Sequence, residues 1–290
     1  MLLDGQKIAQ EIQNEIMHTL QENRYPRKPC LAAVLTTKHP TSIAYVSRKV
    51  KACKEVGIES QVFHLEPADT QELLAFIDKL NGDPTIDGIL IQLPLPPRIH
   101  LLDVLQHIDP TKDVDGFHPL NAGKVLLQDP SAFYPCTPLG IKVMLERYHI
   151  EVAGSHVVIL GRSNIVGKPL ATLLMQEGPG CNATVTVAHS RSRHLREITN
   201  SADILVVAIG KPKRIGPEMI REGCVVVDVG INKIEDPSSK TGYRIVGDVD
   251  FEAVRPKCSA ITPVPGGVGP MTIAMLLSNT VRSFLTRVHS

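Results

Sequence analysis

One stretch decides the fold, and it reads His156-Val-Val-Ile-Leu-Gly-Arg-Ser-Asn-Ile-Val-Gly-Lys-Pro169. The apolar run at 157–160 predicts a buried strand, and Gly161, which has no Cβ, permits a tight turn after it. Gly167 and Pro169 then begin a helix. A strand, a turn and a helix N-terminus together form an anion site, because unpaired N–H groups point at a phosphate. The stretch therefore predicts the first βα unit of a dinucleotide-binding fold.

The glycine spacing departs from the usual dinucleotide fingerprint. Ser163 stands where the middle glycine is expected, and the last glycine, Gly167, comes one residue late. The pattern alone is therefore also compatible with a plain βα turn in an α/β protein.

The end of the next predicted strand, 184–188, favours NADP over NAD. NAD enzymes usually place an Asp or Glu there for the ribose 2′-hydroxyl, whereas this chain has His189-Ser-Arg-Ser-Arg193. Arg162 lies in the preceding turn. Hydroxyl and guanidinium groups suit a 2′-phosphate, which needs donors and positive charge. The alternative interpretation is a solvated basic loop.

Length and composition indicate a two-domain protein that does not bind nucleic acid. The chain has 290 residues, and domains typically contain about 100–150. The net charge of +1 argues against non-specific binding of nucleic acid, which needs a strongly basic surface. The absence of Trp argues against aromatic surfaces on which bases stack.

The same composition predicts a cytoplasmic protein without a metal. The six cysteines are scattered, with no Cys-x-x-Cys pair, which disfavours a zinc site or a disulfide framework and fits a reducing compartment. Charged residues in the first turns disfavour a secretory signal. No apolar run approaches the ~20 residues needed to cross a bilayer, so we expect no membrane partner.

Hydrophobic periodicity predicts an α/β fold with two domains. In the first half, helices and strands alternate, which indicates a parallel sheet with helices on both faces. The strands are expected at 31–35, 60–65 and 88–93, and the helices at 3–20, from Thr41 or Ser42 to Gly57, 70–80 (begun by an Asp69/Glu72 capping box) and 101–108.

A proline-studded passage, 109–138, separates this half from the next. A helix begins at Thr137-Pro138, and strands at Val157, Thr184, Ile204 and Val225 follow the rhythm of a doubly wound domain. The polar segment 235–242 predicts an exposed turn, and Pro270 begins the last helix.

Tyr45 and Lys49 lie four residues apart in the second predicted helix and therefore share a face. Lys49 borders an apolar stripe, where a lysine can be partly desolvated and exchange protons near neutral pH. Lys54 borders the same stripe from the other side, so spacing alone does not choose between them. The alternative is a solvated basic helix face.

Two further polar residues occupy positions where ligands bind. Gln92 falls at the end of the third strand, and prolines stiffen the loop behind it. Gln92 is either part of a fixed wall of a ligand site or an amide at the surface of a strand end. Asp115, before Gly116, can hold paired N–H donors of a planar heterocycle or form an Asx-turn.

Six motifs then match one family in order. The motifs are Tyr45-x-x-x-Lys49, Asp87-Gly-Ile-Leu-Ile-Gln-Leu-Pro-Leu-Pro96, Lys112-Asp-Val-Asp-Gly-Phe117, Pro135-Cys-Thr-Pro138, Gly161-Arg-Ser-Asn-Ile-Val-Gly-Lys-Pro169 and Pro263-Val-Pro-Gly-Gly-Val-Gly-Pro-Met-Thr272. The chain resembles the bifunctional methylenetetrahydrofolate dehydrogenase/methenyltetrahydrofolate cyclohydrolase (FolD) family over nearly its whole length.

The resemblance implies a homodimer with a folate cleft between two α/β domains. It implies a folate-binding catalytic domain at 1–138, to which the C-terminal helix 270–290 returns, and a Rossmann-like NADP-binding domain at 139–269. The implied activities are NADP-dependent oxidation of 5,10-methylenetetrahydrofolate and hydrolysis of the 5,10-methenyl product to 10-formyltetrahydrofolate. Because the sequence ends at Ser290, we expect no formyltetrahydrofolate synthetase domain.

The resemblance also implies roles for single residues. Lys49 would transfer protons in the hydrolysis, tuned by Gln92; Tyr45 would stack on the aminobenzoyl ring; Asp115 would hold the pterin. The implied NADP contacts are Thr137, Gly161, Arg162, Ser163, Ser190 and Ile231.

Two other functions remain open on the sequence alone. One is a different NADP-dependent dehydrogenase, of the shikimate or amino-acid dehydrogenase type, on a similar two-domain fold. The other is a non-catalytic nucleotide-sensing module, against which the joint presence of Lys49, Gln92 and Asp115 argues.

Overall fold

The computed structural model describes residues 1–23, 25–239 and 242–288. The chain divides into two compact units, each with its own parallel sheet. Unit 1 comprises Met1–Ala9 and Thr137–Thr272, and unit 2 comprises Gln10–Cys136 and Ile273–Ser290. The two-unit α/β architecture confirms the predicted fold class, including the grouping of the C-terminal helix with the N-terminal part of the chain.

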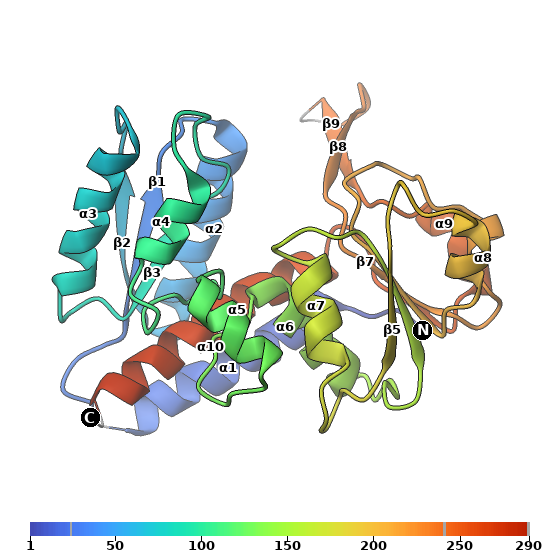
Figure 1. Cartoon of the computed structure of the whole chain (residues 1–290), viewed down its shortest axis with the longest axis horizontal. Helices are drawn as coiled ribbons and strands as arrows, with labels where there is room; N and C mark the ends of the chain where they lie inside the picture. The colour runs from blue at the N-terminus through green and yellow to red at the C-terminus, as the bar shows by residue number, and fades with distance from the viewer. Residues whose placement is uncertain (24, 240–241, 289–290) are drawn as a thin grey trace. The chain divides into compact units, whose positions relative to one another are not determined.

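Unit 2 is built on a three-stranded parallel sheet with the order β2-β1-β3 (Figure 1). The strands are β1 (Cys30–Leu35), β2 (Glu59–His64) and β3 (Gly88–Ile91). Every residue of β1 and β3 is buried, as expected for strands covered on both faces. The helices of this unit are α2 (Pro40–Val56), α3 (Thr70–Gly82), α4 (Leu101–His107) and α5 (Pro119–Leu126), with most of α1 (Gly5–Glu22) and of α10 (Val268–Val288).

Helices α3 and α4 cover one face of this sheet and α2 the other (Figure 1). Ala32 and Val34 of β1 pack in one cluster with Leu73 and Ile77 of α3 and Val104 of α4. Fully burying an aliphatic side chain of this size stabilises a fold by about 1.5–3 kcal/mol. Helix α2 contacts β1 and β2, so the predicted helices on both faces are confirmed.

Two helices begin with a cap that the sequence analysis did not predict. The expected cap of α2, Thr41 or Ser42, is wrong, because α2 begins at Pro40 and His39 Nδ1 accepts from Thr41 N at 3.3 Å. Proline suits a first helical position because its missing N–H has no partner there in any case. Helix α5, inside the passage at 109–138, begins in the same way with a His-Pro pair.

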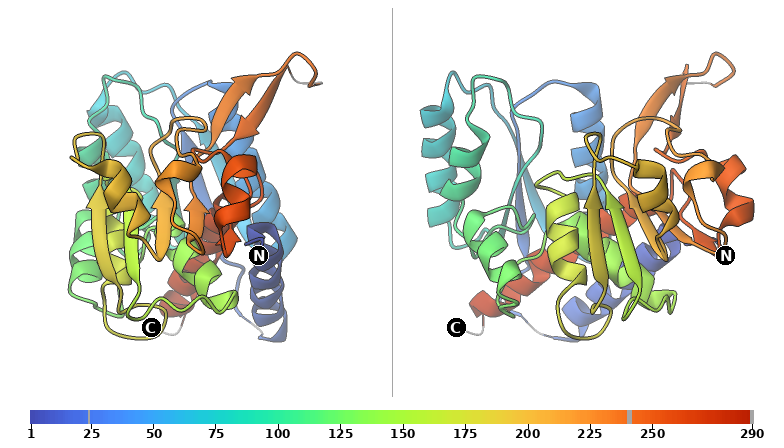
Figure 2. Two further views of the ribbon diagram at one scale, coloured as in Figure 1. Left: turned by 90° about the vertical axis from the view of Figure 1, so that its right-hand side faces the viewer. Right: turned by 45° about the vertical axis from the view of Figure 1, so that its right-hand side comes forward.

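Unit 1 is a five-stranded parallel sheet with the order β10-β7-β6-β4-β5, seen from two directions in Figure 2. Helices α7 and α8 contact strand β4. The strands are β4 (His156–Leu160), β5 (Thr184–Ala188), β6 (Ile204–Val207), β7 (Val225–Asp228) and β10 (Ala260–Ile261). The helices are α6 (Cys136–Arg147), α7 (Gly167–Leu174), α8 (Leu195–Asn200), α9 (Phe251–Val254) and the 3₁₀ turns η1 (Pro217–Met219) and η2 (Arg255–Lys257).

The order of these strands creates a switch point at β4. The chain passes from β4 to β5 on one side and then returns to β6 on the other side. In open α/β sheets ligands bind at the carboxyl ends of the strands beside such a point. The turn after β4, residues 161–166, lies there.

The polar segment 235–242 agrees with its prediction at residues 237 and 238, which form an exposed turn, and differs at Glu235. It connects β8 (Asn232–Glu235) to β9 (Tyr243–Val246), an antiparallel pair drawn in orange in Figure 2. Glu235 therefore belongs to a strand, and it pairs with Tyr243. Residues 240 and 241 of the predicted turn lie outside the described residues. Hydrophobic periodicity did not indicate this hairpin, because its strands have only four residues each.

The glycine-rich motif Pro263–Pro270 lies against the start of α1. A Cβ at Gly5 would lie 1.9 Å from Gly267 O, and Gln6 N donates to Gly266 O at 2.9 Å. Two backbones approach so closely here that only glycine fits. The motif then begins α10 at Val268, two residues before the predicted Pro270. In the described part of the chain, no helix combines the length and the apolar character that a membrane span requires.

Candidate active site

Lys49 is a buried lysine in unit 2, with 4% of its surface exposed. It lies on α2 beside Val46 and Cys53, which are buried in the apolar stripe of that helix. Its Nζ lies 4.7 Å above the centroid of the Tyr45 ring, one helical turn earlier. The helix thus presents the ammonium and the ring together.

Gln92 joins this pair from the end of β3. Its backbone N donates to Val34 O at 2.9 Å, and its side-chain Nε2 donates to Leu93 O at 2.8 Å. Because the Nε2 is held by a backbone carbonyl, the amide oxygen faces away from it and accepts from Lys49 Nζ at 3.4 Å. Gln92 is therefore part of a fixed wall.

Asp115 interacts electrostatically with the same group. Burial raises the pKa of the Asp115 carboxyl, and the positive charge of Lys49 acts in the opposite direction. Burial, and next the Asp115 carboxylate, raises the pKa of the Tyr45 phenol. The same two causes raise the pKa of the Cys136 thiol well above its ordinary value. Tyr45 and Cys136 therefore stay protonated at neutral pH.

The turn that carries Asp115 is fixed by contacts that the sequence analysis did not identify. Gly116 has a φ of +74°, and a Cβ there would lie 2.5 Å from Pro135 N. Asn279 Nδ2, on α10, donates to Val114 O at 2.9 Å and lies 3.7 Å from Cys136 Sγ. The glycine in Asp115-Gly116 was the only sequence signal of this close approach.

Burial distinguishes Lys49 from Lys54, the other lysine that borders the apolar stripe of α2. Lys54 is exposed, as are Arg48 and Lys51, and Lys51 pairs with Glu55 at 3.7 Å on the surface. Tyr45, Lys49 and Gln92 form one cluster in unit 2, the charge of Asp115 acts on Lys49 and Tyr45, and Lys54 is not part of this group.

In unit 1, the turn after β4 brings two glycines together. Gly161 has a φ of +135°, and a Cβ there would lie 2.3 Å from Ala208 O. A Cβ at Gly167 would lie 2.2 Å from Gly161 O. The turn therefore leaves no room for side chains at these positions, and it brings the N-terminus of α7 against the end of β4.

Ser163 binds the start of this helix through its side chain, a contact that the sequence did not predict. Its Oγ accepts from Val166 N at 3.1 Å and from Gly167 N at 3.4 Å. A serine hydroxyl that accepts still has its proton to donate, so Ser163 can also bind an anion.

The remaining candidates follow the carboxyl ends of neighbouring parallel strands. Arg162 is exposed after β4, Ser190 is exposed after β5, and Ile231, 60% exposed, follows β7. Thr137 lies in the first turn of α6, where its Oγ1 is 2.9 Å from Thr272 Oγ1. Parallel strands end at one edge of a sheet, so the residues after β4, β5 and β7 share that edge.

Two buried carboxylates, Asp228 and Asp248, hold the loops at this edge. The Asp248 carboxylate accepts from the backbone N–H groups of Ile209, Gly210 and Lys211 at 2.7–2.9 Å and from Asn232 Nδ2 at 2.8 Å. The Asp228 carboxylate accepts from the N–H groups of Gly230, Asp248 and Val249 at 2.9–3.0 Å. Burial raises the pKa of Asp228 to about 6.

Asp248→Ala is expected to lower the free energy of unfolding of unit 1 by about 3 kcal/mol or more. The substitution leaves three backbone N–H groups and an amide without their acceptor, and each buried unsatisfied donor costs about 1–3 kcal/mol. Urea unfolding followed by circular dichroism measures the change. Asp250→Ala is the control, because Asp250 forms a partly exposed pair with Lys213 and should cost less than about 1 kcal/mol. Equal losses in both variants would contradict this account of Asp248.

The residues of unit 1 suit NADP. The edge offers a backbone cradle at Gly161, the N-terminus of α7 and donors on Arg162, Ser163 and Ser190. No carboxylate stands in the segment 189–193 at the end of β5. In the ranges that the structure describes, no group of three or more His, Cys, Asp or Glu side chains is arranged to hold a metal ion.

The cluster in unit 2 suits proton transfer. An ammonium beside an amide oxygen, with a carboxylate nearby, can give a proton to a bound reactant and take one back. The protonated phenol of Tyr45 contributes a flat apolar face.

Two family models match the chain. Residues 3–115 match the catalytic domain of tetrahydrofolate dehydrogenase/cyclohydrolase, and residues 135–288 match the NAD(P)-binding domain of the same family. The bifunctional protein FolD of Protochlamydia amoebophila is 59% identical over 285 residues, which cover 98% of this chain and 97% of that protein.

Solved structures agree with this match. The bifunctional FolD enzyme from Campylobacter jejuni is 47% identical, covers 99% of both chains and superposes with a TM-score of 0.92. The methylenetetrahydrofolate dehydrogenase-cyclohydrolase of Trypanosoma brucei, solved with NADP and an inhibitor, is 37% identical, with a TM-score of 0.93 over 100% of this chain and 99% of that one. The chain therefore belongs to the tetrahydrofolate dehydrogenase/cyclohydrolase family.

Proposed function

We propose that this chain is a bifunctional folate enzyme. It oxidises 5,10-methylenetetrahydrofolate to 5,10-methenyltetrahydrofolate with NADP and then hydrolyses the methenyl compound to 10-formyltetrahydrofolate. The observation that carries the proposal is the buried Lys49, whose Nζ lies 3.4 Å from Gln92 Oε1 and over the Tyr45 ring in a chain of this family. The shikimate-type alternative has no such support, because both matching family models are folate models.

The hydrolysis is assigned to the cluster in unit 2. The methenyl substrate is already an electrophilic cation, so its hydrolysis needs an oriented water and one group that moves protons. Lys49 moves the proton at its Nζ, and Gln92 holds that Nζ in place. Tyr45 stacks on the aminobenzoyl ring, and the Asp115 carboxylate accepts from the N–H donors of the pterin.

The oxidation is assigned to NADP bound at the carboxyl edge of the sheet in unit 1. When bound, NADP accepts the hydride that leaves the folate methylene carbon. Arg162 and Ser190 bind the 2′-phosphate, and the backbone at Gly161 and the hydroxyl of Ser163 bind the pyrophosphate. Thr137 and Ile231 contact the rest of the cofactor.

The corresponding domains are a folate-binding catalytic domain, 1–138 with the helix 270–290, and an NADP-binding domain, 139–269. The protein acts as a homodimer in the cytoplasm, without nucleic acid or membrane partners. The net charge of +1 supports the absence of a nucleic-acid partner, and the scattered cysteines support the cytoplasm.

Assays of both activities on the purified protein test the proposal. Reduction of NADP that depends on methylenetetrahydrofolate reports the oxidation, and decay of methenyltetrahydrofolate above its uncatalysed rate reports the hydrolysis. A protein that reduces NADP with shikimate and not with the folate would overturn the assignment. A protein that binds NADP without either activity would favour the nucleotide-sensing module.

Asp115→Ala is expected to weaken the use of folate in both reactions. The pterin donors lose a charged acceptor, at a cost of about 1–3 kcal/mol, or roughly 5- to 150-fold in kcat/KM. The KM for NADP should not change, since Asp115 belongs to unit 2. Unchanged folate kinetics in a folded variant would show that Asp115 serves only the turn.

A further inference from the structure

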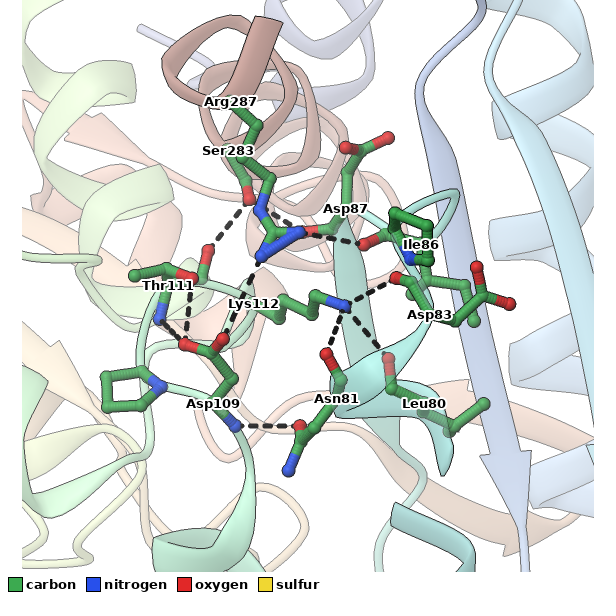
Figure 3. A network of polar contacts seen from close by, with 12 residues as sticks. Leu80, Asn81, Asp83, Ile86, Asp87, Asp109, Thr111, Lys112, Ser283 and Arg287 are labelled. Carbon is green, nitrogen blue, oxygen red and sulfur yellow. Dashed lines mark hydrogen bonds and ion pairs between the residues drawn. The ribbon is translucent and has the colours of Figure 1, made fainter. Parts of the chain in front are cut away.

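Lys112 is a lysine with only 1% of its surface exposed. Its Nζ donates to three backbone carbonyl oxygens, those of Leu80 at 2.9 Å, Asn81 at 2.7 Å and Asp83 at 2.7 Å (Figure 3). Within the described ranges it forms no salt bridge. A buried ammonium is costly unless all of its donors are bonded, and three carbonyls satisfy all three N–H groups.

These carbonyls belong to the end of α3, where backbone oxygens have no partner inside the helix and carry the negative end of its dipole. The Lys112 side chain therefore ties the segment 109–118 to α3. Burial, and next Arg287, lowers the pKa of Lys112. The carboxylates of Asp109, Asp83 and Asp87 act in the opposite direction.

The backbone of the same residue is held by the sheet. Ile89 N, on β3, donates to Lys112 O at 2.8 Å, and Ile89 forms a parallel bridge with Asp113. Ser283 Oγ, on α10, lies 2.6 Å from Asp87 O and 2.7 Å from Thr111 O, so it joins the two segments (Figure 3). Lys112 is thus held at both its main chain and its side chain.

A second anchor follows one residue later. The Asp113 carboxylate accepts from Phe117 N at 3.1 Å, from His118 N at 2.8 Å and from Asn121 Nδ2 at 2.8 Å. These bonds tie Asp113 to the start of α5 and to the residues before it. Asp115 lies inside the turn that the two anchors define.

We propose that Lys112 is a positioning residue for Asp115: by tying the turn to the end of α3, it holds the Asp115 carboxylate where the pterin donors of the folate are bound. This rests on the proposed function, because it takes Asp115 as the pterin-binding group. Lys112 itself does not touch the substrate. Its effect on folate binding passes through the position of the turn.

Lys112→Met tests this inference, because it keeps the apolar stem and removes the donors. We expect the KM for methenyltetrahydrofolate in the hydrolysis to rise about tenfold with kcat within about threefold, since a misplaced binding group mainly weakens binding. The KM for NADP in the oxidation should stay within about twofold. Lys79→Met is the matched control, because Lys79 is an exposed lysine in the last turn of the same helix; its kinetics should equal those of the wild type.

The decisive measurement is a double-mutant cycle with Asp115→Ala. If Lys112 acts through Asp115, then Lys112→Met should raise the folate KM less than about twofold in the Asp115→Ala background. A tenfold rise in both backgrounds would show a separate structural effect and overturn the inference. So would an unchanged folate KM in the folded single variant.

Lys112→Gln, whose amide still donates to a carbonyl, is measured in the same cycle in case Lys112→Met does not fold. Failure of both variants to fold would assign Lys112 to stability alone and overturn the inference. The wild-type assay separates this outcome from a failure of the proposed function, because a wild-type protein without folate activity would overturn the function, whereas an active wild type with unaffected Lys112 variants would overturn only the positioning role.

Discussion

Lys49→Met is expected to abolish most of the cyclohydrolase activity. A placed side chain that transfers protons typically contributes about 10²–10⁴-fold to a rate. Methionine keeps the length and the apolar stem, so the packing of α2 against the sheet should survive. Hydride transfer takes no proton from Lys49, so part of the dehydrogenase activity should remain. Decay of methenyltetrahydrofolate, measured against its uncatalysed rate in the folded variant, gives the result.

Two further variants make this test specific. Lys49→Arg should also be inactive in the hydrolysis, because a guanidinium does not release its proton near neutral pH. Lys54→Met is the matched control, since Lys54 borders the same stripe but is exposed, and it should hydrolyse at the wild-type rate. If Lys49→Met is folded and fully active while Lys54→Met is not, the proton transfer belongs to Lys54.

The second large effect is the preference for NADP over NAD. Arg162 and Ser190 are both exposed after neighbouring strands, and no acid stands at the end of β5. Each charge-assisted hydrogen bond to the 2′-phosphate is worth about 1.5–3 kcal/mol, so two such bonds predict a ratio of kcat/KM of about 10² or more. Equal kcat/KM for the two cofactors would contradict this assignment.

Arg162→Gln assigns the preference to a residue. The substitution should lower kcat/KM with NADP by roughly tenfold or more and leave kcat/KM with NAD nearly unchanged, because NAD lacks the 2′-phosphate. Arg255→Gln serves as the control. Arg255 lies in η2, just before β10, and β10 and β5 are the two outermost strands of the sheet, on opposite sides of it. A loss of the same size with both cofactors would place Arg162 elsewhere on the dinucleotide.

The sequence by itself determined those helices, strands and turns whose pattern involves only residues close together along the chain. The apolar run at 157–160 and the turn after it form β4 and its βα turn, since a short buried strand and a glycine turn need no distant partner to be recognised. The four-residue spacing of Tyr45 and Lys49 likewise placed both side chains on one face of α2.

The tertiary structure alone decided which polar groups are buried and what they hold. Periodicity treated Lys49 and Lys54 alike, and only the packing of α2 on the sheet buries the first and exposes the second. The bonds of Lys112 and Asp248 join segments about 30–40 residues apart, to Leu80 and Ile209 for example. A sequence pattern records neither contact, because burial and hydrogen bonding of a charged side chain depend on chain segments that meet only after folding.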